Sequence, residues 1–333
     1  MRHSLNILLC VGISALFLWL ALRQVELDAL VAQIRAVNAI WIAVTVLVLL
    51  LAHGVRALRW GILLGFPAFQ HTRPLFSSMM IGYLGNNVLP ARMGEVLRIY
   101  ALHRSLNTSR SMAGATILVE RVLDLVVLIG VVGVLSYFVE LPDAIAKFGW
   151  VLLAFFLTGI AVLIGLVVGG QHVARILIFW TRRVSHSTGA RIELLMQRFL
   201  SGMDALKSIS RMLRIAGLTV VVWGAEAIAV AFIFWSLNLR SPWQAAPFLL
   251  VVLSLSFVIP AAPGGIGTYE YFAGVALGAF SIGDSQAAAV ALVLHAVTFL
   301  VATGLGLICL WSESLSLKVL AGGEAPTGAI SCD

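Results

Sequence analysis

Residues 260–270, PAAPGGIGTYE, interrupt an apolar run that extends from 244 to 281. Proline removes a helical hydrogen bond, and closely spaced glycines permit backbone that is not helical. A helix cannot continue through this stretch, and each flanking half is too short to cross about 30 Å of hydrocarbon. Because the freed backbone groups would have no partners in lipid, they must be shielded by protein. The run therefore predicts a re-entrant hairpin of two half-helices.

A second interruption, NNVLPARMGE at residues 86–95, lies within the apolar run 74–103. Pro90 and Gly94 predict the same kind of break, and the halves on either side are again too short to span a bilayer. We expect Asn86 and Asn87 to act as helix caps at this break rather than as ligands. This run therefore predicts a second re-entrant hairpin.

The rest of the chain has the composition of a membrane protein. Of 333 residues, 61% are hydrophobic and 11% are charged, with a mean hydropathy of +1.02. Soluble domains are about 45–50% apolar and about 25% charged, so an ordinary soluble enzyme, a disordered chain and a coiled coil are excluded. Six further apolar runs are long enough to span a membrane: 5–22, 38–58, 112–139, 150–169, 215–238 and 285–311.

Charge predicts the orientation. The segment 170–214 holds eight basic residues against two acidic ones, in a chain of net charge +7. Basic loops stay in the cytoplasm, so both termini of this multi-pass membrane protein are predicted to be cytoplasmic. This segment either forms an amphipathic helix on the anionic leaflet or serves only to determine topology.

The placement of the spans predicts an internal repeat. Each break is flanked by two spans, and the two hairpins enter from opposite sides. Glu95 and Glu270 are 175 residues apart, as are Glu120 and His295. Inverted repeats with broken helices are typical of transporters, although two coincidental breaks are the alternative.

The predicted fold class is an all-α polytopic membrane protein, with about six spanning helices and two broken, re-entrant helices in an inverted repeat. Residues 1–312 form one transmembrane domain. Its halves at 38–139 and 215–311 are linked by the span 150–169 and the basic segment 170–214, and a short cytoplasmic tail occupies 313–333.

Ionisable residues within lipid are costly and therefore indicate function. With the glycines of the second break they form a predicted substrate-binding set: Arg92, Glu95, Arg98, Glu120, Arg121, Asp124, Gly264, Gly265, Gly267, Glu270 and His295.

Chemistry suggests roles for this set. Arg92, Arg98 and Arg121 would bind phosphate, to which arginine can bond bidentately. The acidic residues and the histidine would orient these arginines or carry protons. The alternative is a set of structural ion pairs, such as Arg92–Asp124 or Glu95–Arg121.

The half-helix N-termini near Gly94 and Gly267 would also offer free amides to an anion. His53, Arg56 and Arg59 lie near the end of a predicted span, where snorkelling to the interface explains them. Motifs of soluble catalysis, such as a P-loop or HExxH, are absent, as are Cys/His clusters. The sequence therefore predicts no enzyme activity, no cofactor and no metal.

Three motifs carry a family resemblance. They are Asn87-x-x-Pro90-x-Arg92-x-Gly94-Glu95, Glu120-Arg121-x-x-Asp124, and Pro263-Gly264-Gly265-x-Gly267-x-x-Glu270. In this order they resemble the flippase-like integral membrane family, over about residues 5 to 312. That family includes the transmembrane region of lysylphosphatidylglycerol synthase, uncharacterised bacterial inner-membrane proteins and hopanoid-associated members.

The resemblance implies lipid binding and translocation between leaflets, but it does not carry over lysyl transfer or the use of transfer RNA. The expected partner is a membrane lipid: an anionic phospholipid, a hopanoid or a polyprenyl-phosphate-linked head group. No nucleic acid is expected. A second hypothesis is a non-transporting protein that presents a lipid to a separately encoded lipid-modifying enzyme or glycosyltransferase. An intramembrane enzyme ranks third, because no nucleophile or metal cluster accompanies the carboxylates.

Overall fold

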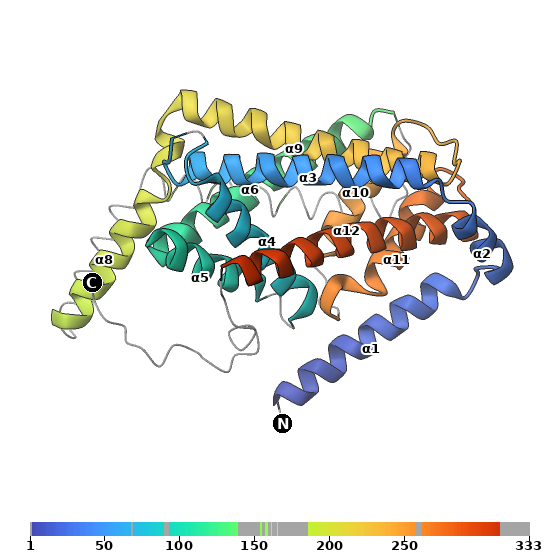
Figure 1. Ribbon diagram of the computed structural model, residues 1–333, viewed down its shortest axis with the longest axis horizontal. Helices are drawn as coiled ribbons and strands as arrows, with labels where there is room; N and C mark the ends of the chain where they lie inside the picture. Colours follow the sequence, from blue (N-terminus) through green and yellow to red (C-terminus); the bar gives the residue numbers. More distant parts are fainter. Residues whose placement is uncertain are drawn as a thin grey trace.

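The computed structural model describes most of the chain, namely residues 2–67, 69–89, 93–138, 154, 157–158, 161, 165, 186–257 and 262–313. Every regular element in these ranges is a helix (Figure 1). The predicted span at 150–169 and the tail after residue 313 lie outside the described residues, apart from isolated positions in the span.

Three helices in the described part are long and apolar enough to cross a membrane: α3 (Ala39–Leu63), α9 (Ile209–Ser236) and α12 (Asp284–Ser312). Two more form where spans were predicted, α1 (Arg2–Leu22) and α6 (Arg110–Leu135), although α6 carries three ionisable residues in its first half. The all-helical class is thus confirmed.

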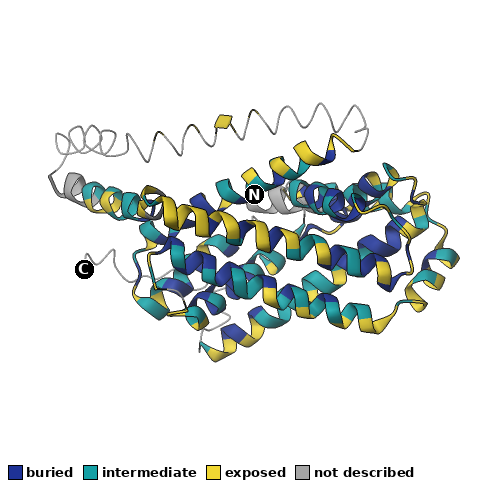
Figure 2. Cartoon of the chain, turned by 90° about the horizontal axis from the view of Figure 1, so that it is seen from above, coloured by how far each residue is buried: buried dark blue, intermediate teal, exposed yellow. Residues whose placement is uncertain are grey.

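The outer faces of the long helices are apolar, as a lipid environment requires. On α3, Leu47 and Leu51 are 56% and 62% exposed, and on α12, Leu300 and Ile308 are 67% and 61% exposed. Figure 2 shows exposed positions along the outside of the bundle and buried ones facing its centre. Such wide apolar exposure identifies a surface that lipid covers.

The first predicted break separates α4 (Thr72–Val88) from α5 (Gly94–Leu106), and the two helices pack side by side as a hairpin. A Cβ on Gly94 would lie 2.0 Å from the Gly82 carbonyl oxygen. Only glycine allows so close an approach. Pro90 and Arg92 of the break are outside the described residues.

The second break separates α10 (Ala245–Ser256) from α11 (Thr268–Gly278), with a short 3₁₀ turn η3 (Pro263–Gly265) between them. Three glycines at this turn have φ of 76°, 76° and 88°, which side chains other than glycine rarely adopt. They are Gly264, Gly265 and Gly267. Their conformation explains why the turn is rich in glycine.

The helix bundle has two ends, which differ in charge. At the first, the end of α3 lies beside the start of α9, and Ser105 in the last turn of α5 donates to Glu313 after α12. We call it the basic end, since Arg73, Arg104, Arg110, Lys207, Arg211 and Arg214 lie there. At the opposite end, the Asn38 amide donates to the Ser236 carbonyl.

The first hairpin starts from the basic end and the second from the opposite end (Figure 1). Their tips meet, because a Cβ on Gly264 would lie 3.7 Å from the Asn87 carbonyl oxygen. Asn87 also donates to Thr303 of α12 at 3.0 Å, so it joins two helices instead of capping one.

Two smaller helices complete the described bundle. Helix α8 (His186–Ser201), followed by η2 (Asp204–Lys207), lies in the basic segment for which an amphipathic helix was one prediction, and it packs against α6. Helix α2 (Leu27–Arg35) packs against α12 and was not predicted from the sequence.

Candidate functional site

Arg59 lies at the centre of the bundle and is fully buried. Its Nη1 donates to Asp124 Oδ1 at 2.6 Å and to Thr219 Oγ1 at 3.0 Å, and its Nη2 donates to Glu120 Oε1 at 2.8 Å. One guanidinium therefore connects α3, α6 and α9.

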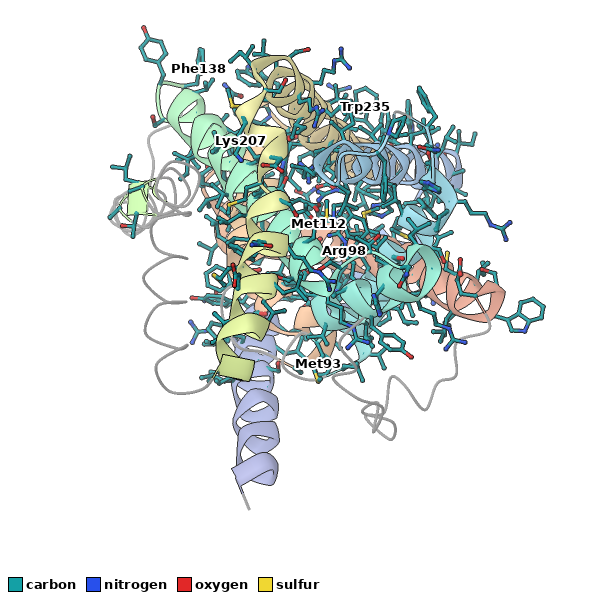
Figure 3. The ribbon with its side chains drawn as sticks, turned by 90° about the vertical axis from the view of Figure 1, so that its left-hand side faces the viewer. Met93, Arg98, Met112, Phe138, Lys207 and Trp235 are labelled. Atoms are coloured by element: carbon teal, nitrogen blue, oxygen red, sulfur yellow. The ribbon has the colours of Figure 1, made fainter. Side chains whose placement is uncertain are left out.

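Two more arginines surround this contact. Arg98 of α5 donates to the other Glu120 oxygen at 2.8 Å and lies 3.8 Å from the centroid of the Trp60 ring. Arg56 donates to Glu226 of α9 at 2.6 Å. Figure 3 shows Arg98 among the side chains in the middle of the bundle.

We call these six residues the central charge cluster: Arg56, Arg59, Arg98, Glu120, Asp124 and Glu226. Three cations balance three anions, so the net charge removed from water is zero. Each arginine Nε is buried without a hydrogen-bond partner among the described residues. Because breaking a buried pair leaves an uncompensated charge, the cluster holds these helices together.

The cluster corrects one sequence interpretation. Arg56 and Arg59 were expected to snorkel at a span end near residue 58, yet α3 continues to Leu63 and both side chains point into the bundle. Glu120 and Asp124, four residues apart, share a helix face, and that face meets Arg59. Carboxylates inside the membrane need cationic partners, and the need of Glu120 and Asp124 for such partners could have pointed to Arg56 and Arg59.

Arg121 lies on the next face of α6 and forms an ion pair with Glu95 of α5. This is one of the two structural pairs foreseen from the sequence. The side chains are 49% and 33% exposed, so the pair is open to the surroundings of the bundle. Arg92, the partner in the other foreseen pair, lies outside the described residues.

The second hairpin brings Glu270 and His295 together. His295 Nδ1 lies 2.6 Å from Glu270 Oε1, and His295 Nε2 donates to the Gly264 carbonyl oxygen at 3.0 Å. A carboxylate and a carbonyl oxygen can only accept, so each of these short contacts requires a proton. The proton between Glu270 and His295 can reside on either partner. We call these two residues the glutamate–histidine pair.

The amides of the two glycines at the predicted half-helix N-termini have hydrogen-bond partners. The Gly94 amide donates to Asn86 Oδ1 at 3.0 Å, which confirms Asn86 as a cap. The Gly267 amide donates to Glu270 Oε2 at 2.6 Å. Buried backbone donors need partners, and in both breaks a nearby side chain supplies one.

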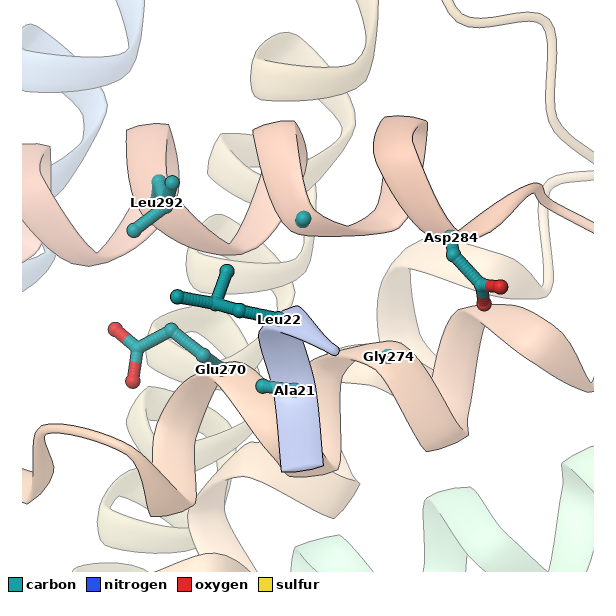
Figure 4. A pocket seen from close by; sticks show the side chains of 7 residues that line it. Ala21, Leu22, Glu270, Gly274, Asp284 and Leu292 are labelled. Atoms are coloured by element: carbon teal, nitrogen blue, oxygen red, sulfur yellow. The ribbon is translucent and has the colours of Figure 1, made fainter. Parts of the chain in front are cut away.

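A small pocket adjoins the glutamate–histidine pair (Figure 4). It lies between α1, α11 and α12, with Glu270 and Asp284 on its wall. Helix α1 closes the site from one side, because Ser14 Oγ accepts from the Ala262 amide at 2.8 Å. A Cβ on Gly267 would lie 2.2 Å from the Ser14 carbonyl oxygen, so Gly267 allows α1 to pack against the break.

The sequence is similar to that of a known protein family. The family profile described as the lysylphosphatidylglycerol synthase TM region matches residues 7–306. The chain belongs to this family. The match includes both hairpins, the central charge cluster and the glutamate–histidine pair, so the chain is a membrane protein of the lysylphosphatidylglycerol synthase TM region family.

Similar relatives come from archaea. The UPF0104 membrane protein MJ1595 of Methanocaldococcus jannaschii is 25% identical over 314 residues, 90% of this chain and 92% of the relative. The UPF0104 membrane protein MJ1078 of the same organism is 29% identical over 192 residues, 56% of this chain and 75% of the relative.

A third relative bears a functional name. Glycosyltransferase AglD of Haloferax volcanii is 25% identical over 259 residues, 67% of this chain but 40% of that protein. The similarity is thus confined to part of AglD. No solved structure matches the chain.

Proposed function

We propose that this protein binds an anionic lipid or a lipid-linked phosphate and moves its head group between the two leaflets. One observation carries the proposal: the tips of two broken helices meet inside the bundle, next to the glutamate–histidine pair. Irregular backbone at membrane depth typically forms the substrate site of a transporter.

The fold supports an inverted repeat as the basis of this movement. The helices α3 to α6 and α9 to α12 each comprise a long helix, a hairpin and a second long helix, and their hairpins start from opposite ends. With α1 and the segment 150–169, the long helices would make six spans. Rocking of one half against the other would expose the meeting point to each leaflet in turn.

Charge supports the orientation. The basic end would face the cytoplasm of the inner membrane, with both chain termini on that side. Arg121 is the exposed guanidinium closest in sequence to the central charge cluster, and exchange of Glu95 for a lipid phosphate would give it a bidentate partner. Arg98 already forms an ion pair with Glu120. Arg98 could therefore bind phosphate, as predicted, only after this ion pair breaks.

The test is leaflet exchange in vesicles that contain the purified protein and a fluorescent phosphatidylglycerol or a labelled polyprenyl phosphate. We expect exchange above the rate of empty vesicles, and about a tenfold loss in Glu270→Gln, which weakens a charge-assisted contact. Arg211→Gln, on the exposed surface of α9, is the matched control. Exchange at the empty-vesicle rate for both lipids would refute transport.

A second candidate is lipid presentation to a separate enzyme. The name of AglD favours it, because that relative is called a glycosyltransferase and the similarity covers 40% of its length. In this case the protein would bind the lipid without moving it. Binding of the labelled lipid with no leaflet exchange would support presentation over transport.

A further inference from the structure

A groove on the outside of the bundle lies apart from both sites described above. It has a volume of about 400 Å³ and is formed at the basic end by α3, α9 and the loop that follows α3. Its lining is Leu58, Ile62, Phe69, Arg214, Gly217 and Leu218. This volume is within the range of about 300–1,000 Å³ that is common for small-ligand sites.

The walls of the groove are suited to a hydrocarbon chain. Leu58 and Ile62 of α3 face Leu218 of α9, and Gly217 opens space between the helices because nothing lies within 4 Å of the position of its missing Cβ. Phe69 is 77% exposed, at a φ of 66° that bulky residues rarely adopt. The loop thus adds an aromatic ring to the lining of the groove, and most of that ring stays exposed.

Arg214 is the one charged residue in the lining. It is exposed and has no ion-pair partner among the residues that the structure describes. It also lies at the basic end, where the cations of the chain gather. A free guanidinium beside an apolar groove complements an amphiphile with an anionic head, since guanidinium binds phosphate bidentately.

We infer that the groove binds one anionic phospholipid from the leaflet at the basic end, with an acyl chain between α3 and α9 and its phosphate on Arg214. The proposal is independent of transport, because the groove shares no residue with the central charge cluster or the glutamate–histidine pair.

The experiment is native mass spectrometry of the purified protein titrated with phosphatidylglycerol or phosphatidylcholine. Gly217→Leu should fill the groove and remove one bound lipid of either kind from the complex. Arg214→Gln should weaken phosphatidylglycerol about fivefold, the effect of one cation near an anionic surface, and weaken phosphatidylcholine less, because the choline cation offsets the charge of its phosphate.

Two controls lie on the same helix. Gly224 is also exposed with an open Cβ position, and Arg211 is also exposed, but neither lines the groove. Gly224→Leu and Arg211→Gln should therefore retain both lipids as the native chain does. Wild-type retention in Gly217→Leu, or equal loss in Gly224→Leu, would overturn the proposal. So would a dimer that only Gly217→Leu abolishes, since a second copy would then be the occupant.

Discussion

Arg59 contacts two carboxylates and a hydroxyl from two other helices, and its side chain is inaccessible. We predict that Arg59→Met lowers the stability of the protein by about 3–5 kcal/mol, because it removes one member of a buried ionic group. The measurement is thermal unfolding in a mild detergent, followed by tryptophan fluorescence.

Arg121→Met is the matched comparison for Arg59→Met. Its ion pair with Glu95 is about half exposed, so its loss should cost about 0–1 kcal/mol. Equal destabilisation by the two substitutions would show that burial of Arg59 does not determine its contribution.

Sequence reasoning found part of the acidic side and part of the basic side of the central charge cluster. Glu120, Asp124 and Arg98 were identified because charges inside apolar runs stand out. Arg56 and Arg59 were misplaced, since hydropathy marks a span end wherever charges begin. Spacing could have corrected this, because residues three apart share one helix face and the carboxylates needed partners.

At the scale of elements, the second break depends on Gly267. Its φ of 88° and its contact with the α1 backbone leave no room for a side chain. We predict that Gly267→Ala costs more than about 1 kcal/mol, because a residue with a Cβ is strained at this φ and would displace α1. Thermal unfolding and cross-linking between α1 and α11 would measure both effects.

Gly274 of α11 provides the control. Nothing lies within 4 Å of its missing Cβ, and its backbone is helical. Gly274→Ala should be neutral or stabilise the helix by up to about 1 kcal/mol. If both alanines were tolerated equally, the close packing of α1 on the break would not be required.

Most helices could be predicted because proline and glycine mark the breaks and long apolar runs mark the spans. The boundaries were less accurate, since α3 and α9 extend several residues beyond their apolar runs. Helix α2 was missed because its nine residues are polar on one side, and it depends on packing against α12. No local pattern encodes such a tertiary contact.

At the scale of the whole molecule, the two hairpins start from opposite ends, and the excess of basic residues lies at one of them. If lipid crosses between the halves, each end must face a different side of the membrane. Cationic loops are retained in the cytoplasm, so the loop after α3 should be inside and the loop after α11 outside. Gln70 and Ser281 lie in these loops.

We therefore predict that Ser281→Cys reacts with a membrane-impermeant thiol reagent in intact cells, whereas Gln70→Cys reacts only after permeabilisation. Both variants would be made with Cys10, Cys309 and Cys332 replaced by serine, so that the new thiol is the only one. Reaction of both in intact cells would place the two ends on one side. This would contradict the inverted arrangement, because hairpins that enter from the same side cannot expose their meeting point alternately to the two leaflets.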